Sequence, residues 1–216
     1  MIIIGSLLVV GALVLGWLIA RTRPTNGDKI ADYANPQRAV VVIDVQEDYT
    51  GTGAKPPFPY KDSTLVVQAL NDLAKVAAAR QVLVIYVRHE FGGILGRAFS
   101  IIFSHGTALP GTPGAALDGR LAVGSQPVFT KPSADAFSCA AFEQFLIEHR
   151  VNELFLAGLD AEYCVRSTAR GALARGYKVN IVSDGILLLA ERRRDRLLRQ
   201  FQREGIRLEA SHGCLA

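Results

Sequence analysis

The chain has 216 residues, half of them hydrophobic, and a formal net charge of +4. Once about twenty apolar N-terminal residues are set aside, the remaining length suits one globular domain with a single core. The basic residues are not interleaved with aromatic residues in the way that a nucleic-acid groove requires, so we expect no nucleic-acid partner. Three cysteines without a Cys-x-x-Cys pair form neither a disulfide framework nor a zinc pattern.

The N-terminal segment of residues 2–20 is apolar and carries no charge. As a helix rising about 1.5 Å per residue it would reach about 28 Å, close to the thickness of a bilayer's hydrocarbon core. Basic residues follow it, at Arg21 and Arg23. The positive-inside rule then predicts a single-pass transmembrane anchor at residues 1–21, with the domain that follows it in the cytoplasm. A cleaved signal peptide is the alternative, and it would need basic residues before the apolar run.

A polar stretch with proline and glycine follows at residues 22–37 and is typical of a linker. From Arg38 onward, apolar runs of strand length alternate with segments of helical periodicity, which predicts βαβ units and a parallel sheet. The stretch from His89 to Ser125 has no clear periodicity and is expected to form a binding loop or lid. Strands are expected at residues 39–45, 82–87, 127–131, 154–158, 178–183 and 206–210, and helices at residues 63–79, 140–150, 161–176 and 190–204.

Three residues with acid, base or nucleophile chemistry follow different predicted strands. Asp44 and Lys131 end the first and third strands, and Cys164 lies in the first turn of the helix after the fourth. Because ligands bind at the carboxyl ends of parallel strands, we expect the three to converge. The helix start and Lys131 would favour the Cys164 thiolate, and Asp44 can accept the thiol proton.

Such a set predicts acyl transfer through a thioester, with backbone N–H groups at the helix start holding the oxyanion. Each residue also has a purely structural interpretation. Asp44 could cap a strand end, Lys131 could be a surface lysine, and Cys164 could fill the core.

The chain resembles the isochorismatase-like cysteine hydrolases, a family that includes isochorismatases, nicotinamidases and N-carbamoylsarcosine amidases. The resemblance spans residues 38–209. Four motifs carry it, namely VVVIDVQEDY with Asp44, GTPGAAL at residues 111–117, KPSADAF with Lys131, and LAGLDAEYCVRSTARGALARGYKV with Cys164. The resemblance implies that Asp44, Lys131 and Cys164 form the catalytic triad.

The same resemblance implies a three-layer α/β/α domain at residues 38–216 with a six-stranded parallel sheet. It also implies a non-proline cis peptide at Leu159–Asp160 beside the oxyanion site. The residues expected to bind the substrate are Gln46, Tyr49, His89, Phe137 and Tyr163. Members resembling nicotinamidase carry an aspartate and several histidines as metal ligands after the second strand. Since this chain offers only His89, Glu90 and the distant His105 there, we expect no metal and no other cofactor.

These observations predict hydrolysis of a C–N bond in a small amide, carbamoyl or ureido compound. Two alternatives remain open: vinyl-ether cleavage of an isochorismate-like substrate, and a membrane-tethered binding protein that has lost catalysis.

Two further segments have more than one interpretation. The arginine-rich helix at residues 190–204 is typical of a solvated face, with contact to anionic lipid as a second hypothesis. Residues 94–103 are apolar but too short to span a bilayer, and predict a lid, a pocket wall or an oligomer contact. The sequence leaves open whether the chain forms a homo-oligomer.

Overall fold

The computed structural model describes residues 16, 19–54, 60 and 62–215. A six-stranded sheet runs through the domain in the order β3-β2-β1-β4-β5-β6, and all five strand pairs are parallel. This confirms the predicted six-stranded parallel sheet. The strands are β1 Gln37–Ile43, β2 Leu83–His89, β3 Val128–Lys131, β4 Val151–Gly158, β5 Lys178–Ile186 and β6 Arg207–Glu209.

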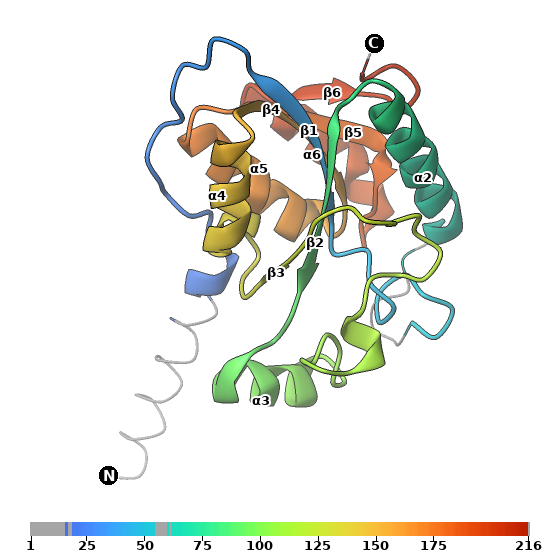
Figure 1. The fold of residues 1–216 in the computed structure, drawn as a ribbon. Helices are drawn as coiled ribbons and strands as arrows, with labels where there is room; N and C mark the ends of the chain where they lie inside the picture. The colour runs from blue at the N-terminus through green and yellow to red at the C-terminus, as the bar shows by residue number, and fades with distance from the viewer. Residues whose placement is uncertain (1–15, 17–18, 55–59, 61, 216) are drawn as a thin grey trace.

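Helices cover both faces of the sheet, as the three-layer architecture requires (Figure 1). Side chains alternate along β1, so Val41 and Ile43 join the core that α4, α5 and α6 cover, while Val40 and Val42 join the core under α2. Because β1 is central and apolar on both faces, it matches the continuous β-branched run seen in the sequence. The helices are α2 Ser63–Ala79, α3 Gly93–Phe103, α4 Ala140–Glu148, α5 Arg166–Ala174 and α6 Arg194–Arg203, with short helical turns at Pro113–Ala115, Ala136–Ser138, Ala161–Val165 and Glu191–Arg193.

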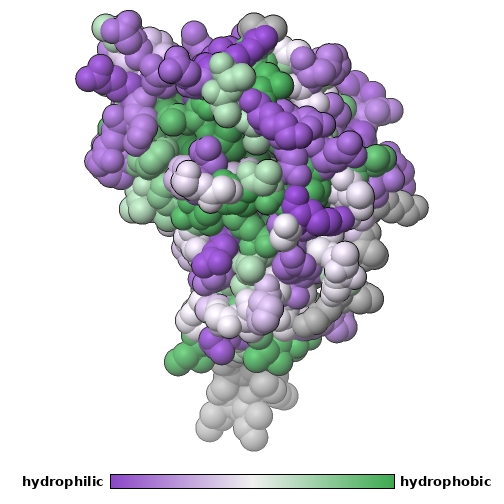
Figure 2. All heavy atoms as spheres, turned by 45° about the vertical axis from the view of Figure 1, so that its right-hand side comes forward, coloured by the Kyte–Doolittle hydropathy of each residue, from purple (hydrophilic) through white to green (hydrophobic). Residues whose placement is uncertain are grey.

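The stretch from His89 to Ser125 contains a helix that its sequence pattern did not predict. Helix α3 occupies Gly93–Phe103 and lies at the lower edge of the domain in Figure 1. Its outward side chains are apolar, so the alternation of polar and apolar residues that marks a surface helix is missing. Figure 2 shows apolar atoms exposed along the same lower edge.

The predicted linker at residues 22–37 is hydrogen-bonded to the domain. The backbone N and the hydroxyl of Thr25 both donate to Oδ2 of Asp135, at 2.7 and 2.8 Å. The backbone N of Ile30 donates to the carbonyl of Arg175 at 2.9 Å, and the Arg175 guanidinium donates to the carbonyl of Thr25. The segment therefore lies against the α4 and α5 side of the domain.

Most of the predicted membrane anchor lies outside the described residues. Of residues 2–20 the structure describes only 16, 19 and 20, and residues 19–22 are helical. Within the described part of the chain, no helix combines the length and the apolar character needed to cross a bilayer.

Candidate active site

Asp44 follows β1 directly, and its backbone turns the side chain out of the sheet. Its φ of 56° lies in the left-handed region, which aspartate tolerates better than most residues. Its backbone N–H donates to the carbonyl of Val87 on β2 at 2.7 Å, so the turn is fixed by the neighbouring strand. The carboxylate is thereby placed at the carboxyl end of the sheet, where the sequence predicted it.

Lys131 ends β3 and reaches Asp44 across β2. Its Nζ lies 2.9 Å from Oδ2 of Asp44, and both side chains are buried, at 0% and 3% exposure. Nζ also donates to the carbonyl of Ser133 at 3.0 Å. Burial acts to lower the pKa of Lys131, but the charges of Asp44 and Cys164 outweigh it and raise the pKa. Lys131 is therefore a buried cation and not a surface lysine.

The carboxylate of Asp44 keeps one oxygen available. Oδ2 pairs with Lys131, while Oδ1 is buried and has no hydrogen-bond partner of ordinary geometry among the described residues. Burial raises the pKa of Asp44, although Lys131 and Cys164 act to lower it. A carboxylate with a raised pKa and an unused oxygen is suited to accept a proton and to return it.

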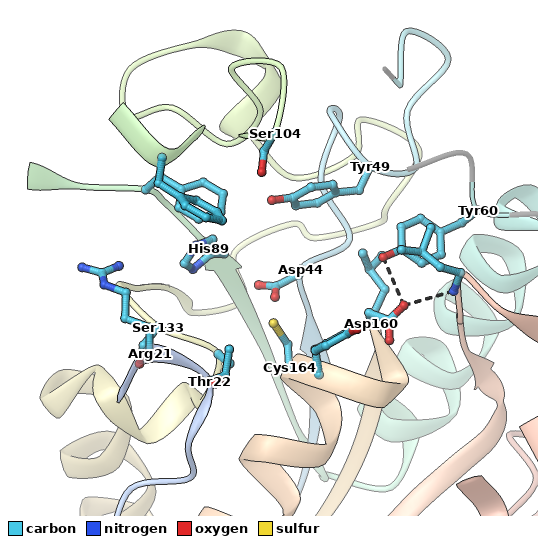
Figure 3. Close-up of a pocket in the computed structure, with 16 residues that line it drawn as sticks. Arg21, Thr22, Asp44, Tyr49, Tyr60, His89, Ser104, Ser133, Asp160 and Cys164 are labelled. Atoms are coloured by element: carbon cyan, nitrogen blue, oxygen red, sulfur yellow. Dashed lines mark hydrogen bonds between the residues drawn. The ribbon is translucent and has the colours of Figure 1, made fainter. Parts of the chain in front are cut away.

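Cys164 lies in the π-helical turn Ala161–Val165 that connects β4 to α5, and its thiol points toward Asp44 (Figure 3). The thiol interacts with both Asp44 and Lys131. The three residues predicted to form the triad therefore meet at one edge of the sheet.

Lys131 acts to lower the pKa of the Cys164 thiol, as expected, but burial has the larger and opposite effect. Burial raises the pKa of the Cys164 thiol to about 12, the Asp44 charge adds to this effect, and Lys131 opposes it only in part. The Asp44 carboxylate that interacts with the thiol is a potential acceptor for its proton.

The turn after β4 is held by close backbone packing and by Asp160. Gly158 has a φ of +104°, and a Cβ placed there would lie 2.0 Å from the carbonyl oxygen of Ile43, so only glycine fits. The peptide bond between Leu159 and Asp160 is cis, as the resemblance implied. The Asp160 carboxylate accepts hydrogen bonds from the backbone N of Glu162 at 2.6 Å and of Leu189 at 3.1 Å.

A cavity of about 300 Å³ opens above the triad and is lined by Asp44, Cys164 and mostly apolar or aromatic side chains. Tyr49, His89 and Tyr163 line it, as predicted for substrate-binding residues. Figure 3 shows Tyr49 and His89 facing Asp44 from the side opposite Cys164. The size of the cavity suits a small molecule, and Asp44 and Cys164 form one part of its wall.

His89 brings an unpaired polar atom to this pocket. Its side chain is buried, and Nδ1 has no hydrogen-bond partner among the described residues. Burial, followed by the charge of Lys131, holds the pKa of His89 well below its ordinary value, so the ring is neutral. The ring contacts Phe91 edge to face, with centroids 4.4 Å apart. A neutral imidazole nitrogen is available for a hydrogen bond to a ligand.

Two residues predicted to bind the substrate do not reach the cavity. Gln46 is fully buried, accepts from the backbone N of His89 at 2.7 Å, and donates to the carbonyls of His89 and Ala115. Its amide positions the His89 backbone. Phe137 lies in the core beneath α4, where its ring packs against Phe142, Tyr177 and the Arg175 guanidinium.

Several pocket residues were not predicted from the sequence. Phe91 and Phe99 supply a wall from the β2–α3 region, which the prediction of a pocket wall at residues 94–103 anticipated only in general terms. Arg21 and Thr22, assigned to the anchor and the linker, also line the cavity. The other unpredicted lining residues are Tyr60, Ser104, Ser133, Ala134 and Leu189.

No group of three or more histidine, cysteine, aspartate or glutamate side chains in the described ranges is placed to hold a metal ion. His105, the most distant of the three ligand candidates, is absent from the cavity lining.

Residues 38–210 match the family model of the Isochorismatase domain. The nicotinamidase of Escherichia coli (strain K12) is 30% identical over 184 residues, which cover 69% of this chain and 83% of that protein. The streptothricin hydrolase of Streptomyces noursei is 29% identical over 170 residues, which cover 78% of this chain and only 60% of the hydrolase.

Among solved structures, an isochorismatase family protein from Desulfovibrio vulgaris subsp. vulgaris str. Hildenborough superimposes with a TM-score of 0.73 at 24% identity, over 82% of this chain and 96% of that one. This similarity establishes the shared fold. Because the family model covers most of the chain and an enzyme relative aligns over more than two thirds of it, the chain belongs to the isochorismatase family of hydrolases.

Proposed function

We propose that the chain is an amidase that cleaves a C–N bond through a covalent Cys164 intermediate. One observation carries the proposal: the Cys164 thiol adjoins a buried Asp44–Lys131 ion pair at the wall of a pocket. A thiol that merely filled the core would have no need of two buried charges, because burying them is costly.

The chemistry follows from the pairing of the three groups. Sγ of Cys164 attacks the carbonyl carbon of the substrate while its proton passes to Oδ1 of Asp44, the oxygen that has no hydrogen-bond partner of ordinary geometry in the described part of the chain. Asp44 then gives this proton to the leaving nitrogen, the C–N bond breaks, and a thioester remains. Asp44 next takes a proton from water, whose hydroxyl attacks the thioester and releases the acid and the Cys164 thiol.

Lys131 keeps its proton throughout this sequence. Its charge stabilises the sulfur as the thiol proton leaves, and its bond to Oδ2 holds Asp44 in place. The backbone N–H of Cys164 is the candidate for holding the oxyanion, because the N–H groups of Ala161, Glu162 and Tyr163 at the start of the turn already donate within the protein.

Among the relatives, the nicotinamidase supports amide chemistry over vinyl-ether cleavage. One similar protein is a nicotinamidase by name, and the name of another describes a hydrolase. In this pocket the neutral His89 ring is placed to donate to or accept from the polar end of an amide, while Tyr49 and Phe91 contact its apolar part. We therefore propose a substrate with a primary amide, carbamoyl or ureido group on an apolar body.

The test is hydrolysis of a panel of such amides by the full chain and by its cysteine variants. Cys164→Ala and Cys164→Ser are expected to abolish turnover, and a thioester is expected to be trapped by hydroxylamine in the unmodified chain. Cys139→Ala is the matched control, because Cys139 is a free, half-buried cysteine that does not line the pocket. Full activity in Cys164→Ala would contradict the proposal, and would favour vinyl-ether cleavage if an isochorismate-like substrate were the one consumed.

A further inference from the structure

Helix α3 exposes an unusual amount of apolar surface for a helix at the edge of a domain. Gly96 and Ser100 face inward, while the outward positions are occupied by large hydrophobic side chains. The exposed set is Ile94, Leu95, Ile101, Ile102 and Phe103, with exposures from 57% to 89%. Contiguous apolar patches of this kind mark surfaces that bind a partner or a membrane.

The charges of α3 are as informative as its apolar residues. Arg97 is the only charged residue in Gly93–Phe103, and it is exposed. A long basic side chain can extend its charge to the lipid headgroups while its stem stays with the apolar residues. An apolar face with a basic and no acidic residue suits the boundary between headgroups and acyl chains.

The N-terminal segment enters the domain on the other side of the same pocket. The carbonyl of Arg21 accepts from the backbone N of Ala134 at 2.9 Å, and the Arg21 guanidinium donates to the carbonyl of Pro132. Arg21 and Thr22 line the cavity on one side, and Phe99 of α3 lines it on another. In Figure 3, Ser104, which follows α3, lies across the pocket from Arg21 and Thr22.

An uncharged apolar segment of 19 residues, 2–20, directly precedes this attachment point. Its length matches a bilayer's hydrocarbon core, and its end is fixed at the rim of the pocket by Arg21. In Figure 1 residues 19–22 and α3 both lie in the lower half of the molecule, away from the C-terminus. A membrane that holds the N-terminal segment would therefore lie next to the exposed face of α3.

We propose that α3 binds the surface of the lipid bilayer that anchors the chain, and that the pocket opens toward this surface. Resting on the amidase function proposed above, this identifies the substrate class as an amide with an apolar chain or ring system that partitions into the bilayer. Phe91 and Phe99 line the pocket between the exposed face of α3 and Cys164, so apolar side chains connect the two. The substrate reaches the triad from the lipid and not from bulk water.

Fluorescence quenching by brominated lipid tests the contact of α3 with the bilayer. Trp17 is the only tryptophan, so the full chain with Trp17→Phe provides a background for a single new tryptophan. Ile101→Trp on α3 is the probe, and Leu65→Trp on α2 is the matched control, because the two positions are similarly exposed at 61% and 65%. Both are reconstituted in phosphatidylcholine vesicles with and without bromine on the acyl chains.

We expect the Ile101→Trp emission to lose most of its intensity in brominated vesicles and the Leu65→Trp emission to keep it. Bromine near the headgroup is expected to quench more than bromine at the chain end, since interfacial helices lie about 5–10 Å deep. Equal emission of the two variants in both kinds of vesicle would overturn the proposal. A blue-shifted Ile101→Trp emission that brominated lipid leaves unquenched and that depends on protein concentration would show a second copy covering α3, and would overturn it too.

A kinetic comparison separates this inference from the proposed function. The double variant Ile101→Glu/Ile102→Glu places charge on exposed positions of α3 that do not line the pocket. The ratio of its rate on a long-chain amide in vesicles to its rate on a short soluble amide is expected to fall about tenfold, which corresponds to about 1.4 kcal/mol. An unchanged ratio contradicts the membrane inference alone. No hydrolysis of either amide by the unmodified chain contradicts the amidase proposal.

Discussion

The ammonium of Lys131 lies 2.9 Å from the carboxylate of Asp44, and the fold removes both from solvent. A single buried ion would lose its hydration without compensation. The charge of Lys131 therefore stabilises the buried carboxylate of Asp44, and the reverse also holds. The interaction that connects the end of β3 to the end of β1 therefore also fixes the position of Asp44, the proposed proton acceptor beside Cys164.

Removing one partner of this pair is expected to cost both stability and activity. Lys131→Met leaves the Asp44 carboxylate buried without a counter-charge, and the free energy of unfolding should fall by about 3–5 kcal/mol. The double variant Asp44→Asn/Lys131→Met should recover much of that loss and remain inactive. Urea unfolding followed by circular dichroism measures the first effect, and amide hydrolysis measures the second. A Lys131→Met protein as stable as the unmodified chain would show that the pair is not coupled to folding.

The reactivity of Cys164 should depend on pH in a characteristic way. With the pKa of the thiol at about 12, alkylation by iodoacetamide is slow at neutral pH. It should accelerate about tenfold per pH unit as the thiolate fraction grows. Because the Asp44 charge raises this pKa, Asp44→Asn should be alkylated faster than the unmodified chain at the same pH while losing hydrolysis. Mass spectrometry of the Cys164 peptide follows the reaction, and slower alkylation of the variant would contradict the assigned role of Asp44.

His89 offers a test of substrate recognition that leaves the reacting groups untouched. His89→Phe keeps a ring against Phe91 but removes Nδ1, which has no hydrogen-bond partner among the described residues, and the hydrogen bond of the ring with the Lys131 backbone, so the free energy of unfolding should fall by about 1 kcal/mol. KM for an amide should rise about tenfold, equivalent to the loss of about one ligand hydrogen bond, with a smaller change in kcat. His149→Phe, at an exposed position on the C-terminal end of α4, is the control. Unaltered KM in His89→Phe would remove His89 from the binding site.

Asp160 is expected to matter for folding more than for proton transfer. Asp160→Ala leaves the backbone N–H groups of Glu162 and Leu189 without their acceptor, which should lower the free energy of unfolding by about 2 kcal/mol or more. Asp160→Asn keeps one acceptor oxygen and should lose less. Thermal and urea unfolding of the two variants at one pH give the comparison, and equal stability would contradict the capping role.

The same residue predicts a pH dependence of stability. Burial raises the pKa of Asp160 in the folded protein above that of an exposed aspartate. The folded state therefore holds the proton more tightly, and stability from this group is present at low pH and lost as the pH rises through the raised pKa. The asparagine of Asp160→Asn does not ionise. The free energy of unfolding of this variant, measured in urea across a pH series, should therefore lack the pH-dependent contribution of Asp160.

The sequence predicted the sheet well because its strands are buried on both faces. Apolar runs such as residues 39–45 leave little alternative to a central parallel strand. Helix α3 was missed for a related reason. Its exposed side chains are apolar, so residues 94–103 have no polar face to reveal the helical period. A helix whose exposed face is apolar lacks the alternation of polar and apolar residues by which a surface helix is recognised in a sequence.

At the site, the predicted strand ends located Asp44, Lys131 and Cys164. The directions in which loop side chains point could not be predicted from the hydrophobic pattern. Phe137 follows β3 closely in sequence, yet the short helical turn Ala136–Ser138 directs its ring into the core. The raised pKa of the thiol also could not be predicted, because it depends on burial and on the distance between three side chains from different strands. The strand ends and the family resemblance both indicated the three residues, whereas their pKa values depend on the fold.

The hydrogen bond from Ala134 to the carbonyl of Arg21 has a practical consequence for anyone shortening this protein. A chain cut at Arg38, where the family match begins, would retain all six strands and the reactive trio. It would nevertheless lack Arg21 and Thr22, which line one side of the cavity beside Asp44 and Cys164. The family match therefore begins at residue 38, whereas the residues that line the cavity begin at Arg21.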